Sequence, residues 1–294
     1  MPAGRLFKYT TADAARVILS NQTLQWSSPV AFNDPFDLKN YFHINFSWSD
    51  LRKDALQKLS VMILSPKEPT RADGNEFAGH IRWLRTNMKG SSLANVKAAL
   101  EQGFNVSFEL CERLTADERN NWLQEREIVR ILCFAERPDN LLMWSHYAEQ
   151  HAGVVLEFET KLFEKSASSR AIKVRYSDVV PAPFTYQQFL DYFLGQKVFP
   201  DVSDYTIAVA SSKYTDWSYE QEWRLLRYED PPKSGLHSYF AYPPDALVGA
   251  YFGSKIDSTK RDGLAPLLKA NYPHALIHTM REKSGRYELE FQPS

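Results

Sequence analysis

Two carboxylates and a guanidinium lie close together in the segment WSYEQEWRLL, residues 217–226. If this segment is a β-strand, its side chains alternate between two faces, so Glu220, Glu222 and Arg224 point in the same direction. One interpretation is an ordinary salt-bridge ladder on a solvated face. Because the neighbouring predicted strands are apolar, the alternative is a carboxylate held in a cleft, where its titration is perturbed as at catalytic sites.

A second polar group lies in FNDPFD, residues 32–37. Asn33, Asp34 and Asp37 carry oxygens that could orient a ligand hydroxyl. Asn-Asp-Pro is also a typical turn sequence, in which the side chains satisfy the local backbone. The pattern therefore favours a structural turn and keeps a ligand-orienting role as the alternative.

The third group is MWSHY, residues 143–147. On a short helix, Met143 and Tyr147 share a face at i,i+4 spacing, so Ser145 and His146 point elsewhere. His146 could donate a hydrogen bond to a phosphate or a ribose, or it could be a satisfied core residue. No second His or Cys stands at metal-ligand spacing, so the sequence predicts no metal site here.

The composition limits the class of protein. The 294 residues are 44% hydrophobic and 24% charged, as expected for a globular chain with a sizeable core. Its 35 basic and 36 acidic residues give a net charge of −1, so no whole-surface attraction to nucleic acid is expected. Cys111 and Cys133 have no paired spacing that would indicate disulfides or zinc. Without a signal-peptide core or an apolar run of roughly 20 residues, we expect a cytoplasmic protein with no membrane partner.

Local patterns predict strands towards both ends of the chain and helices between them. Strands are expected over residues 6–10, 22–28, 128–136, 152–159, 171–178, 221–229, 245–253, 274–281 and 286–292. Helices are expected over residues 11–19 after Thr10 or Thr11, within 137–151 after Asp139 or Asn140, and over 203–214 and 258–272. A mostly helical block runs from about 47 to 125, interrupted by a loop at 65–74.

This order of elements predicts the fold class. Strands and helices do not alternate regularly, and there is neither a Gly-rich dinucleotide fingerprint nor a phosphate-binding P-loop. An α+β fold is therefore expected rather than a doubly wound sheet. We predict one domain over residues 1–294, with a mainly helical insertion at about 47–125.

Three separated stretches resemble the landmarks of a widespread bacterial family, the domain-of-unknown-function 2971 family. They cover residues 6–37, 141–159 and 217–226, and their motifs are FNDPFD, MWSHY and EWR. Membership in that family assigns no activity. More distantly, the order of a short strand, a helix and a second strand is similar to the entrance of ADP-ribosyltransferases, closest to those that modify nucleic acid.

The second resemblance implies a fold and a set of site residues. The fold would be an ADP-ribosyltransferase-like split β core. Such enzymes place His or Arg on the first strand, where this sequence departs from the pattern with Lys8 or Tyr9. A Ser or Tyr on a central element would correspond to Ser145, His146 or Tyr147, and the Glu on a later strand to Glu222.

The resemblance also implies roles for these residues. Glu222 would stabilise the oxocarbenium-like ribose, and Glu220 would position or deprotonate the acceptor, with His146 as a further catalytic group. Residues expected to bind NAD, by stacking, hydrogen bonding or neutralising the diphosphate, are Lys8, Tyr9, Trp144, Ser145, Tyr147 and Arg224.

The function implied is transfer of ADP-ribose from NAD, the substrate, to a nucleic acid or protein acceptor, or hydrolysis of NAD, in a toxin or phage-defence role. No metal is expected, and the oligomeric state is open. A non-catalytic module that binds nucleic acid or a partner is one alternative, with Glu220, Glu222 and Arg224 as a structural ladder. A metal-dependent nuclease is another, which requires Asp34, Asp37 and Glu222 to converge on one ion.

Overall fold

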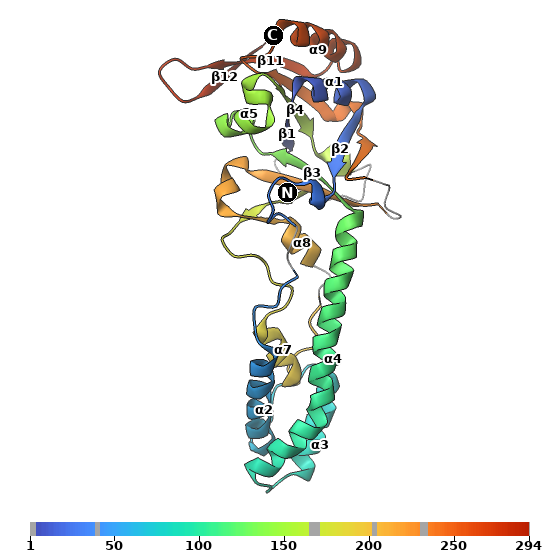
Figure 1. Cartoon of the computed structure of the whole chain (residues 1–294), viewed down its shortest axis with the longest axis vertical. Coiled ribbons are helices and arrows are strands. Elements are labelled where there is room, and N and C mark those ends of the chain that lie inside the picture. Colours follow the sequence, from blue (N-terminus) through green and yellow to red (C-terminus); the bar gives the residue numbers. More distant parts are fainter. Residues whose placement is uncertain (1–3, 39–41, 165–170, 202–204, 230–234, 294) are drawn as a thin grey trace. The chain divides into compact units, whose positions relative to one another are not determined.

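The computed structural model shows two compact units (Figure 1). It describes residues 4–38, 42–164, 171–201, 205–229 and 235–293. The first unit comprises Met1–Lys39, Glu125–Val180 and Val209–Ser294, and the second comprises Asn40–Gln124 and Pro181–Ala208. A mixed sheet together with helices confirms the α+β class. The organisation as a single domain with an insertion stays a prediction.

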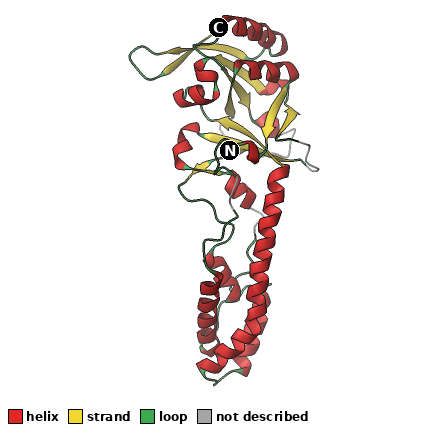
Figure 2. Ribbon diagram, in the orientation of Figure 1, coloured by secondary structure: helices red, strands yellow, loops and turns green. Residues whose placement is uncertain are grey.

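The first unit is built on a ten-stranded sheet within the described residues (Figure 2). Its strands are β1 (Arg5–Thr10), β2 (Thr23–Ser27), β3 (Val129–Ala135), β4 (Val154–Glu159), β5 (Ala171–Lys173), β8 (Glu222–Tyr228), β9 (His237–Ala241), β10 (Leu247–Phe252), β11 (Leu276–Glu282) and β12 (Leu289–Pro293). The order is β12-β11-β10-β4-β1-β3-β2-β9, and β8 pairs with both β3 and β5. All of these pairings are antiparallel except that of β10 with β11. A second, two-stranded sheet joins β6 (Arg175–Tyr176) to β7 (Ser212–Lys213).

The helices of the first unit are α1 (Ala12–Asn21), η1 (Pro29–Ala31), α5 (Leu141–Tyr147), η2 (Glu149–His151), α6 (Lys161–Glu164), η3 (Thr215–Glu220), η4 (Pro244–Ala246) and α9 (Ser258–Asn271). Two of them, α1 and α5, begin at side-chain caps that the sequence indicated. Thr11 caps α1 by accepting from the Ala14 backbone N–H, and Asn140 caps α5. One of the two predicted caps is thus confirmed for each helix.

The sheet separates two cores because successive strand residues point to opposite faces. On one face, Leu6 and Phe158 pack with the buried residues of α1 and α9. On the other face, Phe7, Tyr9 and Val155 pack with residues of α5, among them Trp144 at its centre. Strands buried on both faces hold their side chains rigidly, which suits them to carry a site.

The second unit is helical around an aromatic core. Its helices are α2 (Trp48–Leu64), α3 (Glu76–Asn87), α7 (Tyr186–Phe193) and the greater part of α4 (Leu93–Ile128) and α8 (Tyr205–Ala210), whose last residues belong to the first unit. Phe108 and Phe193 lie 4.1 Å apart between ring centroids, and Phe77 stacks on Phe104 at 4.9 Å. The helices expected between 47 and 125, and the loop at 65–74, are confirmed.

Several local predictions differ from the structure. Elements that had not been predicted include α6, α7 and β9. The strand predicted over 171–178 is divided into β5 and β6, and the helix predicted over 203–214 gives way to α8 and β7. Within the described chain, no helix combines the length and apolarity that crossing a bilayer requires.

Candidate functional site

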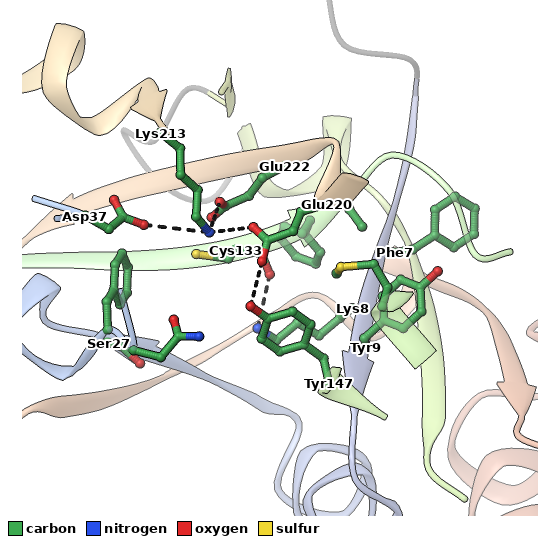
Figure 3. Close-up of a pocket in the computed structure, with 15 residues that line it drawn as sticks. Phe7, Lys8, Tyr9, Ser27, Asp37, Cys133, Tyr147, Lys213, Glu220 and Glu222 are labelled. Carbon is green, nitrogen blue, oxygen red and sulfur yellow. Dashed lines mark hydrogen bonds and ion pairs between the residues drawn. The ribbon is translucent and has the colours of Figure 1, made fainter. Parts of the chain in front are cut away.

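A pocket lies where β1 and β2 part from β3. Strand β3 pairs with β8 along its whole length, but its described residues meet β1 at one Cα pair, Phe7 with Ala135, and β2 at another, Ser27 with Ile131. The pocket has a volume of about 200 Å³ (Figure 3). Its lining, all from the first unit, is Phe7, Lys8, Tyr9, Ser27, Phe32, Asn33, Asp37, Cys133, Phe134, Ala135, Met143, Tyr147, Lys213, Glu220 and Glu222.

The structure corrects the prediction that Glu220, Glu222 and Arg224 share one strand face. Strand β8 begins at Glu222, and Glu220 is the last residue of η3. The two elements are separated by Gln221, whose φ of 45° and ψ of 51° place it in the left-handed region and break the alternation. Glu222 and Arg224 do share a face, since Arg224 Nε donates to Glu222 Oε1 at 2.8 Å.

Glu220 nevertheless lies close to Glu222, because both side chains contact the same cation, Lys213. Lys213 Nζ lies 2.5 Å from Glu220 Oε2, 3.1 Å from Glu222 Oε2 and 3.8 Å from Asp37 Oδ2 (Figure 3). Arg224 donates to both Asp37 oxygens, at 2.8 and 2.6 Å, and to both Glu222 oxygens. All five side chains belong to residues that are at most 8% exposed. A buried network of this kind is costly to break because removal of one member leaves another charge unpaired.

The two glutamates have pKa values shifted in opposite directions. Burial by itself would raise the pKa of Glu222, but Arg224 and Lys213 outweigh it and hold that pKa well below its usual range. Burial raises the pKa of Glu220, and Lys213 offsets this only in part. The 2.5 Å contact with Lys213 favours the ionised form of Glu220, so burial and the ion pair oppose each other at this side chain. Carboxylates pushed apart in pKa are the usual arrangement of a proton donor beside an ionised group.

The two lysines of the pocket also differ. Burial disfavours the charge on Lys213, but Glu222 and Glu220 more than compensate, so its pKa is raised. Burial lowers the pKa of Lys8, and the charges of Cys133 and Glu222 compensate only partly. Lys8 Nζ donates to the Cys133 carbonyl at 3.1 Å. Lys213 is therefore a fixed cation, whereas Lys8 tends towards a neutral amine and is a poorer partner for a diphosphate.

Tyr9 and Asn140 position the helix that supplies Tyr147. The Tyr9 hydroxyl donates to the Arg137 carbonyl at 2.8 Å and accepts from the Asn140 backbone N–H. Asn140 then caps α5, at whose end the Tyr147 hydroxyl donates to Glu220 Oε1 at 2.6 Å. Residues of the first strand and of the MWSHY helix are thereby brought to the same pocket.

Other predicted site residues lie outside the lining of this pocket, as far as the described residues show. Trp144 is fully buried and donates to the Pro138 carbonyl, so it packs in the core instead of stacking on a ligand. His146 is exposed, with Nδ1 3.4 Å from the Tyr219 hydroxyl. Three further residues that do not line it are Ser145, Asp34 and Arg224.

Residues of the FNDPFD turn have two different roles: Asp34 stabilises the turn itself, whereas Asn33 and Asp37 line the pocket. Asp34 Oδ1 accepts from the Phe36 backbone N–H at 2.8 Å, which is the local turn bond that the sequence favoured. Asn33 lines the pocket together with Tyr147. Asp37 lines it as well and is held by Arg224.

Sequence reasoning missed Lys213, the centre of the network. Asp37, Glu220 and Glu222 outnumber Arg224, so three clustered acids beside one cation would have indicated a second cation. The position of Lys213 within the helix predicted over 203–214 concealed it. Burial raises the pKa of the Cys133 thiol, as is usual for a thiol within an apolar strand, although this residue lines the pocket.

The described residues contain no group of three or more His, Cys, Asp or Glu side chains suited to hold a metal ion. The nuclease alternative requires Asp34, Asp37 and Glu222 to converge on one ion. Asp34 is engaged by its own turn, whereas Asp37 and Glu222 already share Arg224 and Lys213. Side-chain cations therefore occupy the position that a metal ion would take between these acids.

A comparison with known families matches a segment of the chain that contains several of the site residues. Residues 143–225 match a family described as Protein of unknown function (DUF2971). The match supports the expected family resemblance over this segment. The segment contains the site residues Tyr147, Lys213, Glu220, Glu222 and Arg224. The chain matches no curated protein and no solved structure.

Proposed function

We propose that the pocket is the active site of an ADP-ribosyltransferase-like enzyme, which transfers ADP-ribose from NAD to a macromolecular acceptor. One observation carries the proposal: Glu222 of the late strand β8 lines the same pocket as Lys8 and Tyr9 of β1 and Tyr147 of α5. The proposed fold, an ADP-ribosyltransferase-like split β core, is supported by the parting of β1 and β2 from β3.

The reaction needs negative charge beside the ribose. The bond between ribose C1′ and the nicotinamide nitrogen breaks, its electron pair leaves with nicotinamide, and C1′ becomes oxocarbenium-like. Arg224 and Lys213 keep the buried Glu222 ionised, so it supplies a fixed, preorganised charge. An acceptor oxygen or nitrogen then attacks C1′, and Glu220 takes the proton that the acceptor loses.

The size and lining of the pocket suit one end of the dinucleotide. Its volume of about 200 Å³ is below the roughly 300–1,000 Å³ of pockets that enclose drug-sized ligands. Phe32, Phe134 and Met143 provide apolar surface for the nicotinamide ring. The adenosine end would lie outside this pocket. A nucleic acid or protein acceptor, and a toxin or phage-defence role, are supported by the resemblance alone.

The test is release of nicotinamide from NAD labelled in that ring. We expect release by the wild-type protein and an approximately 100-fold slower rate for Glu222→Gln, because the amide cannot offset the cationic transition state. Tyr147→Phe, which removes one hydrogen bond to Glu220, should slow the rate by about tenfold. Circular dichroism verifies that both variants are folded. Equal background release by all three proteins, with nucleic acid and protein acceptors present, would contradict the proposal.

A non-catalytic binding module is the second candidate. It is favoured by one observation, that Arg224 and Lys213 already engage both oxygens of Glu222. Binding of NAD in calorimetry without nicotinamide release from any acceptor mixture would support the module. Release that depends on Glu222 would support the enzyme.

A further inference from the structure

We propose that Lys8 is a nucleophilic amine that captures a small aldehyde or ketone in this pocket as an imine. The geometry behind this inference is the placement of Nζ in a partly enclosed pocket, where the described residues offer it one hydrogen-bond acceptor, the Cys133 carbonyl. The inference concerns an activity that does not involve NAD, so it stands or falls separately from the transferase proposal.

The position of Lys8 follows from the parting of the strands. Strand β1 pairs with β4 over six consecutive residues, from Arg5 to Thr10, but meets β3 at the single pair of Phe7 and Ala135. Lys8 lines the space left on the β3 side, and its Nζ donates to the Cys133 carbonyl at 3.1 Å. The side chain of Lys8 therefore satisfies a strand carbonyl and remains partly accessible from the pocket.

The hydrogen bonding of Lys8 favours the neutral amine. An ammonium group has three donors, and this one has a single acceptor within the described part of the chain. No carboxylate of the described residues lies within 4.0 Å of its Nζ, whereas three lie within 4.0 Å of Lys213 Nζ. An ammonium that is largely removed from solvent and has no carboxylate beside it loses its proton more readily than an exposed one. Burial accordingly lowers the pKa of Lys8.

The carboxylates of the pocket are engaged by cations other than Lys8. Lys213 contacts Glu220, Glu222 and Asp37. Arg224 donates to Glu222 and Asp37 as well. None of these contacts holds Lys8 as an ammonium through direct ion pairing.

This arrangement supplies what imine formation requires. The Lys8 nitrogen lone pair attacks the carbonyl carbon, the π electrons of the C=O bond move to oxygen, and Glu220 passes one proton from nitrogen to that oxygen. Glu220 then takes the second proton from nitrogen and donates it to the resulting hydroxyl, which leaves as water as the C=N bond forms. One amine and one carbonyl compound thus give one imine and one water. The small volume and the apolar side chains Phe7, Phe32, Phe134 and Met143 favour small, neutral carbonyl compounds.

The experiment is reductive trapping on the full chain without NAD. The protein is incubated at pH 7 with propanal or benzaldehyde and sodium cyanoborohydride, and each lysine is followed by peptide mass spectrometry. We expect alkylation of Lys8 at least about tenfold faster than that of Lys53 and Lys97, which are exposed on helices. Lys213, held as a cation, should be the least reactive. Equal rates at Lys8 and Lys53 would overturn the inference.

A pH series and one variant test the chemical roles. The alkylation rate of Lys8 should reach half its maximum at a pH at least about one unit below that of Lys53; coincident midpoints would overturn the neutral-amine assignment. Glu220→Gln should slow trapping at Lys8 by about tenfold and leave Lys53 unchanged, because the amide cannot donate the proton. An unchanged rate at Lys8 would overturn the role of Glu220. Lys8→Arg, which keeps a cation but forms no imine, is the matched blank.

Discussion

Glu220 and Glu222 show how one pocket gives opposite properties to two identical side chains. Glu222 accepts from Arg224 and Lys213, whereas Glu220 shares Lys213 with it and accepts from the Tyr147 hydroxyl. The pKa of Glu222 is lowered and that of Glu220 is raised. Since a pKa difference between folded and unfolded states is a contribution to stability, the two residues should respond differently to pH.

The pH dependence has opposite signs for the two acids. Glu222, with its lowered folded pKa, contributes stability that is present above the unfolded pKa of about 4.3 and is lost as pH falls towards the folded pKa. Glu220, with its raised folded pKa, favours folding below about pH 4.3, and this contribution is lost as pH rises through the folded pKa.

We therefore expect Glu222→Gln to lower the free energy of unfolding by about 3 kcal/mol at pH 7 and by a smaller amount at pH 3, which lies between the unfolded and the folded pKa. Glu220→Gln should cost less at pH 7, because its amide oxygen can still accept from Tyr147 or Lys213. Urea titrations at both pH values measure these changes, with Glu288→Gln, an exposed partner of Lys283, as the control. A larger loss for Glu220→Gln than for Glu222→Gln at pH 7 would contradict the assignment.

At the scale of elements, a left-handed turn holds α5 against the sheet. Three consecutive residues, Glu149–His151, have φ angles of 51°, 53° and 71°. Lys255 donates its backbone N–H to the His151 carbonyl, and Gly253 donates to the Gly153 carbonyl, both at 3.0 Å. A Cβ at Gly253 would lie 2.1 Å from the His151 carbonyl oxygen. The turn can therefore pack this closely only because position 253 is a glycine.

Gly253→Ala should therefore destabilise the protein by about 3 kcal/mol, because the atoms it meets are backbone and cannot move aside cheaply. It should also slow trapping at Lys8, because the displaced turn follows the helix that supplies Tyr147. Gly79→Ala in α3 is the control: a Cβ there meets nothing within 4 Å, and we expect a gain of about 0.5–1 kcal/mol. Thermal melts and urea titrations compare the two, and equal effects would contradict the close-approach argument.

Local patterns predicted the elements better than they predicted the network. Thr11 and Asn140 could be foreseen as caps, and the alternation of β8 correctly put Glu222 and Arg224 on one face. Nothing in the sequence indicated the left-handed backbone conformation of Gln221, because residues other than glycine and asparagine seldom adopt it. The pairing of Asp37 with Arg224 joins residues 187 positions apart, which no local period can indicate.

At the scale of the whole molecule, chemistry and stability are distributed unequally. Each unit has its own buried core, and every residue that lines the described pocket belongs to the first unit. The second unit is stabilised by aromatic packing, with Phe104 1% exposed and stacked on Phe77. Mutations in the two units should therefore have separable effects.

We expect Phe104→Ala to lower the free energy of unfolding by about 3–5 kcal/mol through the cavity it leaves. The rate of reductive trapping at Lys8, measured on folded protein at low temperature, should stay within about twofold of wild type, because no pocket contact is lost. Urea unfolding and peptide mass spectrometry give the two readouts. A tenfold loss of Lys8 reactivity in the folded variant would show that the second unit governs the pocket.

The single ladder pair between β1 and β3, Phe7 with Ala135, has a consequence for evolution and engineering. Completing the ladder between these strands would add backbone hydrogen bonds and fill the space in which Lys8 now lies. Selection for thermal stability alone would favour sequences in which β1 and β3 pair along their whole length. The pocket would then be lost as stability increases. The gap between these two central strands thus leaves the space of the pocket at the expense of backbone pairing.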